Sequence, residues 1–176
     1  IALDMNTGKV VWDKMILTVE GGNKGFTGAP LLVKDMVLVG ANGGELSGCC
    51  GPIFAVDAKT GEVRWQFDTI GGDERSRASW GNDSWKTGGG GAPWDGIVYD
   101  PTTDYVYVGT GNGAPWPAEI RSPGGGDHLY LSSIVALDVN TGKYVWHYQA
   151  TPNESWDYDN TSPLMTADLT LGGEKR

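Results

Sequence analysis

The chain has 176 residues and a formal net charge of −9 at pH 7, and its basic residues form no cluster, so it is not expected to bind nucleic acid. No apolar run approaches the roughly 18 residues of a membrane-spanning helix, so the sequence predicts no transmembrane segment. Twenty-eight glycines, nine prolines and eight tryptophans are typical of a turn-rich, all-β protein.

The first predicted element is a β-hairpin that recurs twice along the chain. Its copies occupy residues 2–12, 55–65 and 136–146, and each fits the pattern A-x-D-x-x-T-G-x-x-x-W. In each copy we expect one strand to end at the aspartate, a tight turn in which the glycine adopts a positive φ, and a second strand that carries the tryptophan. Repeats of this kind indicate stacked β-units. We therefore expect Trp12, Trp65 and Trp146 to be buried between neighbouring sheets.

These repeats predict a β-propeller with tryptophan-docking motifs, in which each unit buries its apolar face against its neighbours. Roughly three to four blades fit into the chain, which is fewer than a closed ring needs. The sequence begins inside a repeat at Ile1 and ends without a closing motif. We therefore expect residues 1–176 to be an internal fragment of a single, larger propeller domain.

Two further hairpins are predicted between the repeats. One joins residues 31–33 to residues 36–40, and the other joins residues 96–99 to residues 105–108. Each strand is followed by a glycine-rich or acidic loop, and such loops on a stiff scaffold are where binding and catalytic residues concentrate.

The two cysteines, Cys49 and Cys50, are adjacent in the sequence and cannot link distant segments. They form either a strained vicinal disulfide in an oxidising compartment or two small buried thiols. The two histidines, His128 and His147, lack a second histidine at ligand spacing, so we expect them at the surface or packed against strands.

Four loops carry the candidate site residues. Oxygen ligands are offered by Glu45, Asn112, Asp157 and Asp159, and the sequence lacks the imidazole or thiolate spacing of a zinc site. This donor set favours a hard cation such as calcium. Glycines next to Glu45 and before Trp94 allow the backbone to approach a flat ligand closely.

The order of these loops resembles that of the pyrroloquinoline quinone (PQQ)-dependent alcohol dehydrogenases. The resemblance covers essentially the whole chain and rests on Thr-Gly-Ala-Pro at 27–30, Asn-Gly-Gly-Glu at 42–45, the glycine run that ends in Trp94, Gly-Thr-Gly-Asn-Gly-Ala-Pro-Trp at 109–116 and Trp-Asp-Tyr at 156–158. Residues 121–138 and 143–149 look most like the quinohaemoprotein branch. The resemblance implies an eight-bladed propeller with PQQ near its axis, and a domain with haem c outside this fragment.

It also implies a role for each candidate residue. Glu45 and Asn112 align with metal ligands, and Trp94 aligns with the indole on which PQQ stacks. Asp157 aligns with the catalytic carboxylate that takes the alcohol proton and also faces the metal. The expected cofactor contacts further include Thr27, Asn42, Gly43, Gly44, Cys49 and Cys50. The two cysteines are included because their loop begins at Glu45, although the family's own vicinal disulfide comes from an earlier blade.

Asp159 departs from much of the family, in which this position is small or hydroxylated. A fourth carboxylate or amide ligand favours a larger, more highly charged cation and resembles the lanthanide-using enzymes. A solvated Asp159 and a calcium ion is the equal alternative.

The expected function is oxidation of a primary alcohol to an aldehyde in the periplasm, with electrons passing to a cytochrome c or a quinone. The alternative from another class is a non-catalytic propeller that serves as a scaffold for protein binding. It would need the tryptophan repeats but not the acidic loops.

Overall fold

The computed structural model describes residues 1–17, 25–45 and 51–175. Cys49 and Cys50 lie outside the described residues. The elements are β1 (Ala2–Leu3), β2 (Val10–Trp12), β3 (Leu31–Val33), β4 (Met36–Gly40), β5 (Pro52–Asp57), β6 (Val63–Asp68), α1 (Glu74–Ala78), the 3-10 helix η1 (Gly81–Lys86), β7 (Gly89–Gly90), β8 (Ile97–Asp100), β9 (Tyr105–Gly109), β10 (Gly113–Ala114), α2 (Ala118–Arg121), β11 (Ser133–Asp138), β12 (Tyr144–Gln149), β13 (Thr170–Leu171) and β14 (Glu174–Lys175).

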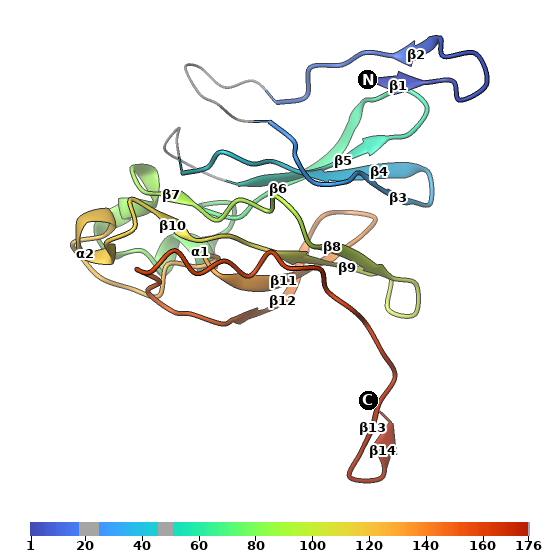
Figure 1. Cartoon of the computed structure of the whole chain (residues 1–176). Coiled ribbons are helices and arrows are strands. Elements are labelled where there is room, and N and C mark those ends of the chain that lie inside the picture. Colours follow the sequence, from blue (N-terminus) through green and yellow to red (C-terminus); the bar gives the residue numbers. More distant parts are fainter. Residues whose placement is uncertain (18–24, 46–50, 176) are drawn as a thin grey trace.

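Two four-stranded antiparallel sheets lie one above the other (Figure 1), with strand orders β3-β4-β5-β6 and β12-β11-β9-β8. The β3–β4 and β8–β9 hairpins are the two predicted between the repeats. The β1–β2 pair lies beyond the first sheet, and the β13–β14 pair projects from the end of an extended tail (Figure 1). The all-β prediction is confirmed.

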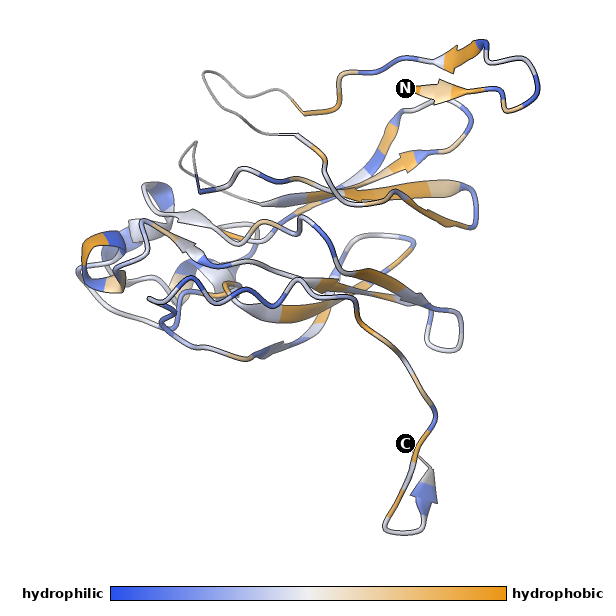
Figure 2. Ribbon diagram, in the orientation of Figure 1, coloured by the Kyte–Doolittle hydropathy of each residue, from blue (hydrophilic) through white to orange (hydrophobic). Residues whose placement is uncertain are grey.

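The main hydrophobic core lies between these two sheets. Strand β4 shows why, because its buried residues alternate with half-buried ones and so present one apolar face. Figure 2 shows hydrophobic residues concentrated along the strands of both sheets. The buried side chains of this core are Val33, Met36, Leu38, Ile53, Ala55, Trp65, Phe67, Val106, Val108, Tyr130, Val135, Leu137 and Val139. Each large aliphatic side chain buried here stabilises the fold by about 1.5–3 kcal/mol relative to its exposed state.

The three repeat hairpins share one register. In each, the alanine of the pattern pairs with the tryptophan, and the pairing shifts directly after the alanine. The pairs are Ala2 with Trp12, Ala55 with Trp65 and Ala136 with Trp146. The same sequence therefore builds the same bulged hairpin three times.

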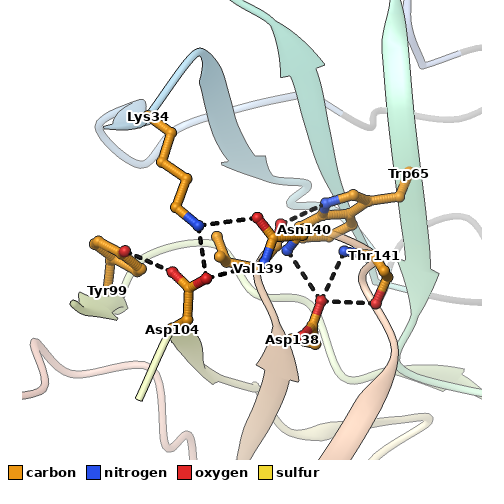
Figure 3. Close-up of polar contacts among 8 residues, drawn as sticks. All are labelled: Lys34, Trp65, Tyr99, Asp104, Asp138, Val139, Asn140 and Thr141. Atoms are coloured by element: carbon orange, nitrogen blue, oxygen red, sulfur yellow. Dashed lines mark hydrogen bonds and ion pairs between the residues drawn. The ribbon is translucent and has the colours of Figure 1, made fainter. Parts of the chain in front are cut away.

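The aspartate of each repeat organises the turn. Asp138 Oδ1 accepts hydrogen bonds from the backbone N–H groups of Asn140 at 3.1 Å and Thr141 at 2.9 Å (Figure 3). Gly142 N–H donates to Asp138 O at 2.8 Å, and Gly142 has a φ of +67°. Equivalent bonds form in the other two turns, so the pattern specifies the turn through its aspartate and glycine.

The tryptophan of one repeat contacts the turn of the next. Trp65 Nε1 donates to Val139 O at 2.8 Å (Figure 3), and Trp12 Nε1 donates to Ala58 O at 3.0 Å. A Cβ atom on Gly142 would lie 2.6 Å from the Trp65 ring. The turn glycine therefore both adopts the positive φ and leaves room for the indole.

The burial of the three tryptophans differs from the prediction. Trp65 is 7% exposed and Trp12 is half-buried, but Trp146 is 41% exposed, so the expectation for Trp146 is wrong. The ring of Trp146 packs against Tyr107 with the centroids 5.7 Å apart. The sequence holds no fourth copy of the repeat whose turn could cover this indole.

A polar cluster joins the edges of the two sheets. Lys34 Nζ lies 2.6 Å from Asp104 Oδ2 and 2.9 Å from Asn140 Oδ1 (Figure 3). The hydroxyl of Tyr99 donates a hydrogen bond of 2.7 Å to Asp104 Oδ1 (Figure 3). Lys34, followed by Asn140 and Tyr99, lowers the pKa of the Asp104 carboxyl to about 2. The turn after β3 is therefore tied to the turns before β9 and β12.

The segments between the repeats fold into short helices that the sequence did not predict. Asp73 caps α1 by accepting a hydrogen bond from Ser76 N at 2.7 Å. His128 is buried against Trp80, with the ring centroids 4.6 Å apart, and His147 packs against Tyr130. The expected packing against strands is confirmed for His147 in β12, whereas His128 is buried against Trp80 next to the 3-10 helix. In the described part of the chain, no helix has the length and apolar character needed to cross a membrane.

Candidate functional site

Loops from four parts of the chain meet around one cavity of about 520 Å³. The residues that line it are Thr27, Asn42, Gly43, Glu45, Trp94, Asp157 and Asp159. All seven are candidate residues from the sequence, and they span more than 130 positions of the chain between Thr27 and Asp159. Two four-stranded sheets thus bring the predicted residues to one place.

The loop after β4 is fixed by short polar contacts. Asn42 Oδ1 accepts a hydrogen bond from Gly25 N at 2.8 Å, and Asn42 N–H donates to Gly25 O at the same distance. Gly44 O accepts from Gly90 N at 3.2 Å, and a Cβ on Gly44 would lie 2.8 Å from Gly90 O. Gly44 is therefore needed for this close approach, and the contact orients Glu45 at the cavity.

Trp94 provides an apolar surface at the cavity. It is 37% exposed, and its backbone oxygen accepts a hydrogen bond from Thr27 Oγ1 at 3.4 Å. The backbone of Gly111 lies close to the indole, because a Cβ on Gly111 would be 3.5 Å from Trp94 Nε1. An exposed indole anchored in this way can stack on a planar ligand.

Asn112 lies directly behind Asp159 instead of lining the cavity. It is 1% exposed, and its backbone N–H donates to Asp159 Oδ1 at 2.8 Å. Its side-chain Nδ2 donates to Gly113 O at 3.1 Å. The structure therefore brings Asn112 next to the predicted ligands, in contact with one of them through its backbone.

Both aspartates of the last loop are exposed, and the Asp159 carboxyl also accepts the bond from Asn112 N. Asp157 is exposed and has a φ of +65°, which is uncommon for a residue other than glycine. Desolvation raises the pKa of the Asp159 carboxyl, and the neighbouring charges of Asp157 and Glu154 act in the same direction. Hydrogen bonds from Asn112 and Trp94 oppose that shift. The two aspartate carboxyls thus repel each other in the absence of a cation.

The donor set suits a hard cation. Glu45, Asp157 and Asp159 bring three carboxylates to the cavity, and no lysine or arginine is among the described residues that line it. Among those residues, no three His, Cys, Asp or Glu side chains stand close enough to hold a metal ion by themselves. Oxygen donors spread around an acidic cavity fit a cation whose shell is completed by a bound ligand.

Sequence reasoning missed a buried polar group beneath this site. Glu154 is 0% exposed, and Arg121 is 2% exposed. Arg121 donates to the backbone oxygens of Glu154 at 2.5 Å, Pro115 at 2.7 Å and Trp116 at 2.9 Å. The carboxylate of Glu154 accepts a hydrogen bond from Gly113, which is 41 residues away in the sequence. No local sequence pattern therefore indicates the role of Glu154.

A family model described as the β-propeller domain of PQQ glucose/ethanol/alcohol dehydrogenases matches residues 6–176. The chain is 46% identical over its whole length to quinohemoprotein alcohol dehydrogenase ADH IIB of Pseudomonas putida, of which it covers 27%. It is 40% identical to the lanthanide-dependent methanol dehydrogenase of Methylacidiphilum fumariolicum strain SolV, with 99% of this chain and 31% of the relative covered.

Among solved structures, the quinohemoprotein alcohol dehydrogenase of Comamonas testosteroni aligns with a TM-score of 0.92 and 45% identity. This alignment covers 100% of the chain and 28% of that protein. The chain therefore spans about a quarter to a third of the relatives it matches.

Proposed function

Because the chain belongs to the family of PQQ glucose, ethanol and alcohol dehydrogenase β-propeller domains, we propose that it forms the cofactor-binding part of an enzyme that oxidises a primary alcohol to an aldehyde. The observation that carries this proposal is the single cavity lined by Glu45, Trp94, Asp157 and Asp159. A non-catalytic scaffold would have no need for three carboxylates around an exposed indole.

The residues of the cavity fit PQQ and a cation. Trp94 would support the planar ring system, and Thr27, Asn42, Gly43 and Gly44 would surround it. Glu45, Asn112, Asp157 and Asp159 would hold the cation, with the side chain of Asn112 turning from Gly113 towards the cavity. PQQ supplies the acceptor for the hydride that leaves the alcohol carbon, and the cation supplies a Lewis acid.

Asp157 is the residue proposed to move the proton. Its exposed carboxylate accepts the hydroxyl proton of the alcohol while the carbon–hydrogen bond breaks, so that an aldehyde forms and two electrons leave the substrate. Trp94 would cover one face of the bound PQQ ring. Electrons would then pass to a cytochrome c or a quinone.

The wider setting follows from the same family. We propose that the sheets are blades of an eight-bladed propeller whose repeats dock through Trp12 and Trp65, and that the whole protein acts in the periplasm. A haem c domain outside residues 1–176 is part of this proposal, given the identity to quinohemoprotein relatives. The cation is calcium or a lanthanide, and the 40% identity to a lanthanide-dependent relative supports the second.

The test is reconstitution of the full-length protein with PQQ and either Ca²⁺ or La³⁺, using a panel of primary alcohols and an artificial electron acceptor. We expect alcohol oxidation that needs both PQQ and a cation. Replacement of the proposed base by Asp157→Asn should lower kcat by about 10²–10⁴-fold, because a positioned base contributes that much, while PQQ content stays unchanged.

The matched control is Asp127→Asn, which changes an exposed aspartate that does not line the cavity. It should leave kcat near that of the wild type. Alcohol oxidation that persists in Asp157→Asn would exclude this residue as the base, and a wild-type protein that oxidises no alcohol would refute the proposed function.

A further inference from the structure

The buried carboxylate of Glu154 connects two loops of the candidate site. Its Oε2 accepts a hydrogen bond from Gly113 N at 3.1 Å. Its Oε1 accepts from Tyr158 N at 3.1 Å and also from Trp156 N. Glu154 itself is 0% exposed and its bond to Gly113 is buried, so loss of this acceptor would leave a buried N–H unpaired.

The first of these loops carries Asp157. The two residues that flank Asp157, Trp156 and Tyr158, both donate their backbone N–H groups to the same oxygen of Glu154. Between them Asp157 has a φ of +65°, a conformation that costs about 1–2 kcal/mol for a residue with a Cβ. Such a conformation persists only when its surroundings fix it, and the Glu154 carboxylate fixes the backbone on both sides.

The second loop carries Asn112. Gly113, which donates to Glu154, directly follows Asn112, and Asn112 N–H donates to Asp159 Oδ1 at 2.8 Å. The loops of Asn112 and Asp157 are therefore joined through Glu154, through Asp159 and through the bond from Asn160 N to Thr110 O at 3.0 Å, and the bond between Gly113 and Glu154 is buried. Among these links, the Glu154 carboxylate is the one that also holds the backbone on both sides of Asp157.

Only a carboxylate satisfies this arrangement. All three partners of Glu154 are N–H donors, and an ionised carboxylate is an acceptor at both oxygens. A glutamine would direct its NH₂ group against one of the donors and so break the link to one loop. Arg121 donates to the backbone oxygen of Glu154 at 2.5 Å, which leaves both carboxylate oxygens to the loops.

We propose that Glu154 is a positioning residue that holds the carboxylate of Asp157 in the orientation needed to take the alcohol proton. This inference rests on the proposed function, because it assigns Glu154 to the same site. Glu154 does not contact the substrate and acts through the backbone of residues 156–158.

The experiment compares the full-length wild-type enzyme, loaded with PQQ and a cation, with Glu154→Gln. Four quantities are measured, namely kcat, the isotope effect on kcat with an alcohol deuterated at its reacting carbon, the PQQ content, and the amide exchange of Gly113, Trp156 and Tyr158. The control is Glu119→Gln, which neutralises an exposed glutamate on α2.

We expect kcat of Glu154→Gln to fall by about 10–100-fold, since small misplacement of a catalytic group has effects of that size. The isotope effect should rise, because hydride and proton transfer become more rate-limiting. The PQQ content should stay at the wild-type level, and exchange should accelerate at the three amides but not in β9 or β11. Glu119→Gln should match the wild type in all four quantities.

An unchanged isotope effect together with a kcat that falls in proportion to PQQ content would overturn the inference, because it would mean fewer intact sites instead of a misplaced base. If Glu154→Gln does not fold, Glu154→Asp serves in its place. Its carboxylate is one methylene shorter and reaches only one loop, so wild-type kcat and exchange in that variant would also overturn the inference. A wild-type enzyme without alcohol oxidation would instead refute the proposed function, while the amide exchange would still test the link between the loops.

Discussion

Arg121 determines which ring nitrogen of its buried neighbour His128 carries the proton. Its guanidinium can only donate hydrogen bonds, so His128 Nδ1 must accept the bond of 3.2 Å between them. The ring proton then lies on His128 Nε2, which faces Gly125 O at 3.3 Å. Desolvation, followed by the charge of Arg121, lowers the pKa of His128 from 6.5 to about 4.

Because of this lowered pKa, we expect the free energy of unfolding to depend on pH. In the folded state His128 stays neutral down to about pH 4, whereas in the unfolded chain it takes up a proton below pH 6.5. Its contribution to stability is therefore complete above pH 6.5 and is lost as the pH falls towards 4. Between pH 7 and pH 5 the loss amounts to about 2 kcal/mol.

The measurement is the Tm of the full-length protein and of His128→Asn at both pH values. Asparagine tolerates the φ of +58° at this position and can accept the bond from Arg121 without titrating. The Tm advantage of the wild type over the variant should shrink at pH 5. An advantage that is constant or grows on acidification would contradict the assignment of a neutral, buried His128.

The candidate residues that the structure brings to one cavity are those that the sequence marks with a local motif. Glu45, Trp94, Asp157 and Asp159 follow glycine-rich or Trp-Asp signatures, and all four line the cavity. The role of Glu154 depends on Gly113, which is 41 residues away, and on burial that composition does not reveal. Contacts between residues this far apart could not be predicted from the sequence alone.

The repeat hairpin is the element that the sequence specifies most fully. Its aspartate, its glycine and its tryptophan each have a defined partner, and the same register recurs in all three copies. Burial of the tryptophan is different, because it depends on the neighbouring element. Trp65 is covered by the turn at Gly142, whereas Trp146 is 41% exposed.

A substitution in this turn separates backbone strain from packing. Gly142→Ala places a Cβ 2.6 Å from the ring of Trp65, at a φ of +67°. Gly125→Ala is the matched control, because it has a φ of +71° but no heavy atom within 4 Å of the added Cβ. The control should cost about 1–2 kcal/mol of unfolding free energy from strain alone.

Gly142→Ala should cost about 1–3 kcal/mol more than the control, because the Trp65 indole must move from its bond to Val139 O. The unfolding free energies of both variants in the full-length protein check this difference. Equal losses in the two variants would mean that the contact between Trp65 and the turn adds nothing to stability.

In the molecule as a whole, the two four-stranded sheets bring loops from distant parts of the chain together at one cavity. The sequence predicted the all-β class and the order of the loops. It did not predict the short helices α1, η1 and α2, because these lie in segments without a periodic apolar pattern. Because three carboxylates line this cavity and no lysine or arginine is among the described residues that line it, the cavity carries a negative charge.

We propose that this cavity holds PQQ and a cation. The most direct measurement is a crystal structure of the full-length protein with PQQ and La³⁺, using the anomalous scattering of lanthanum. We expect one strong peak at metal–oxygen distances of about 2.3–2.6 Å from Glu45, Asn112 and Asp157, with Asp159 as a further ligand and PQQ stacked on Trp94. A lanthanum peak and PQQ located away from these residues would contradict it.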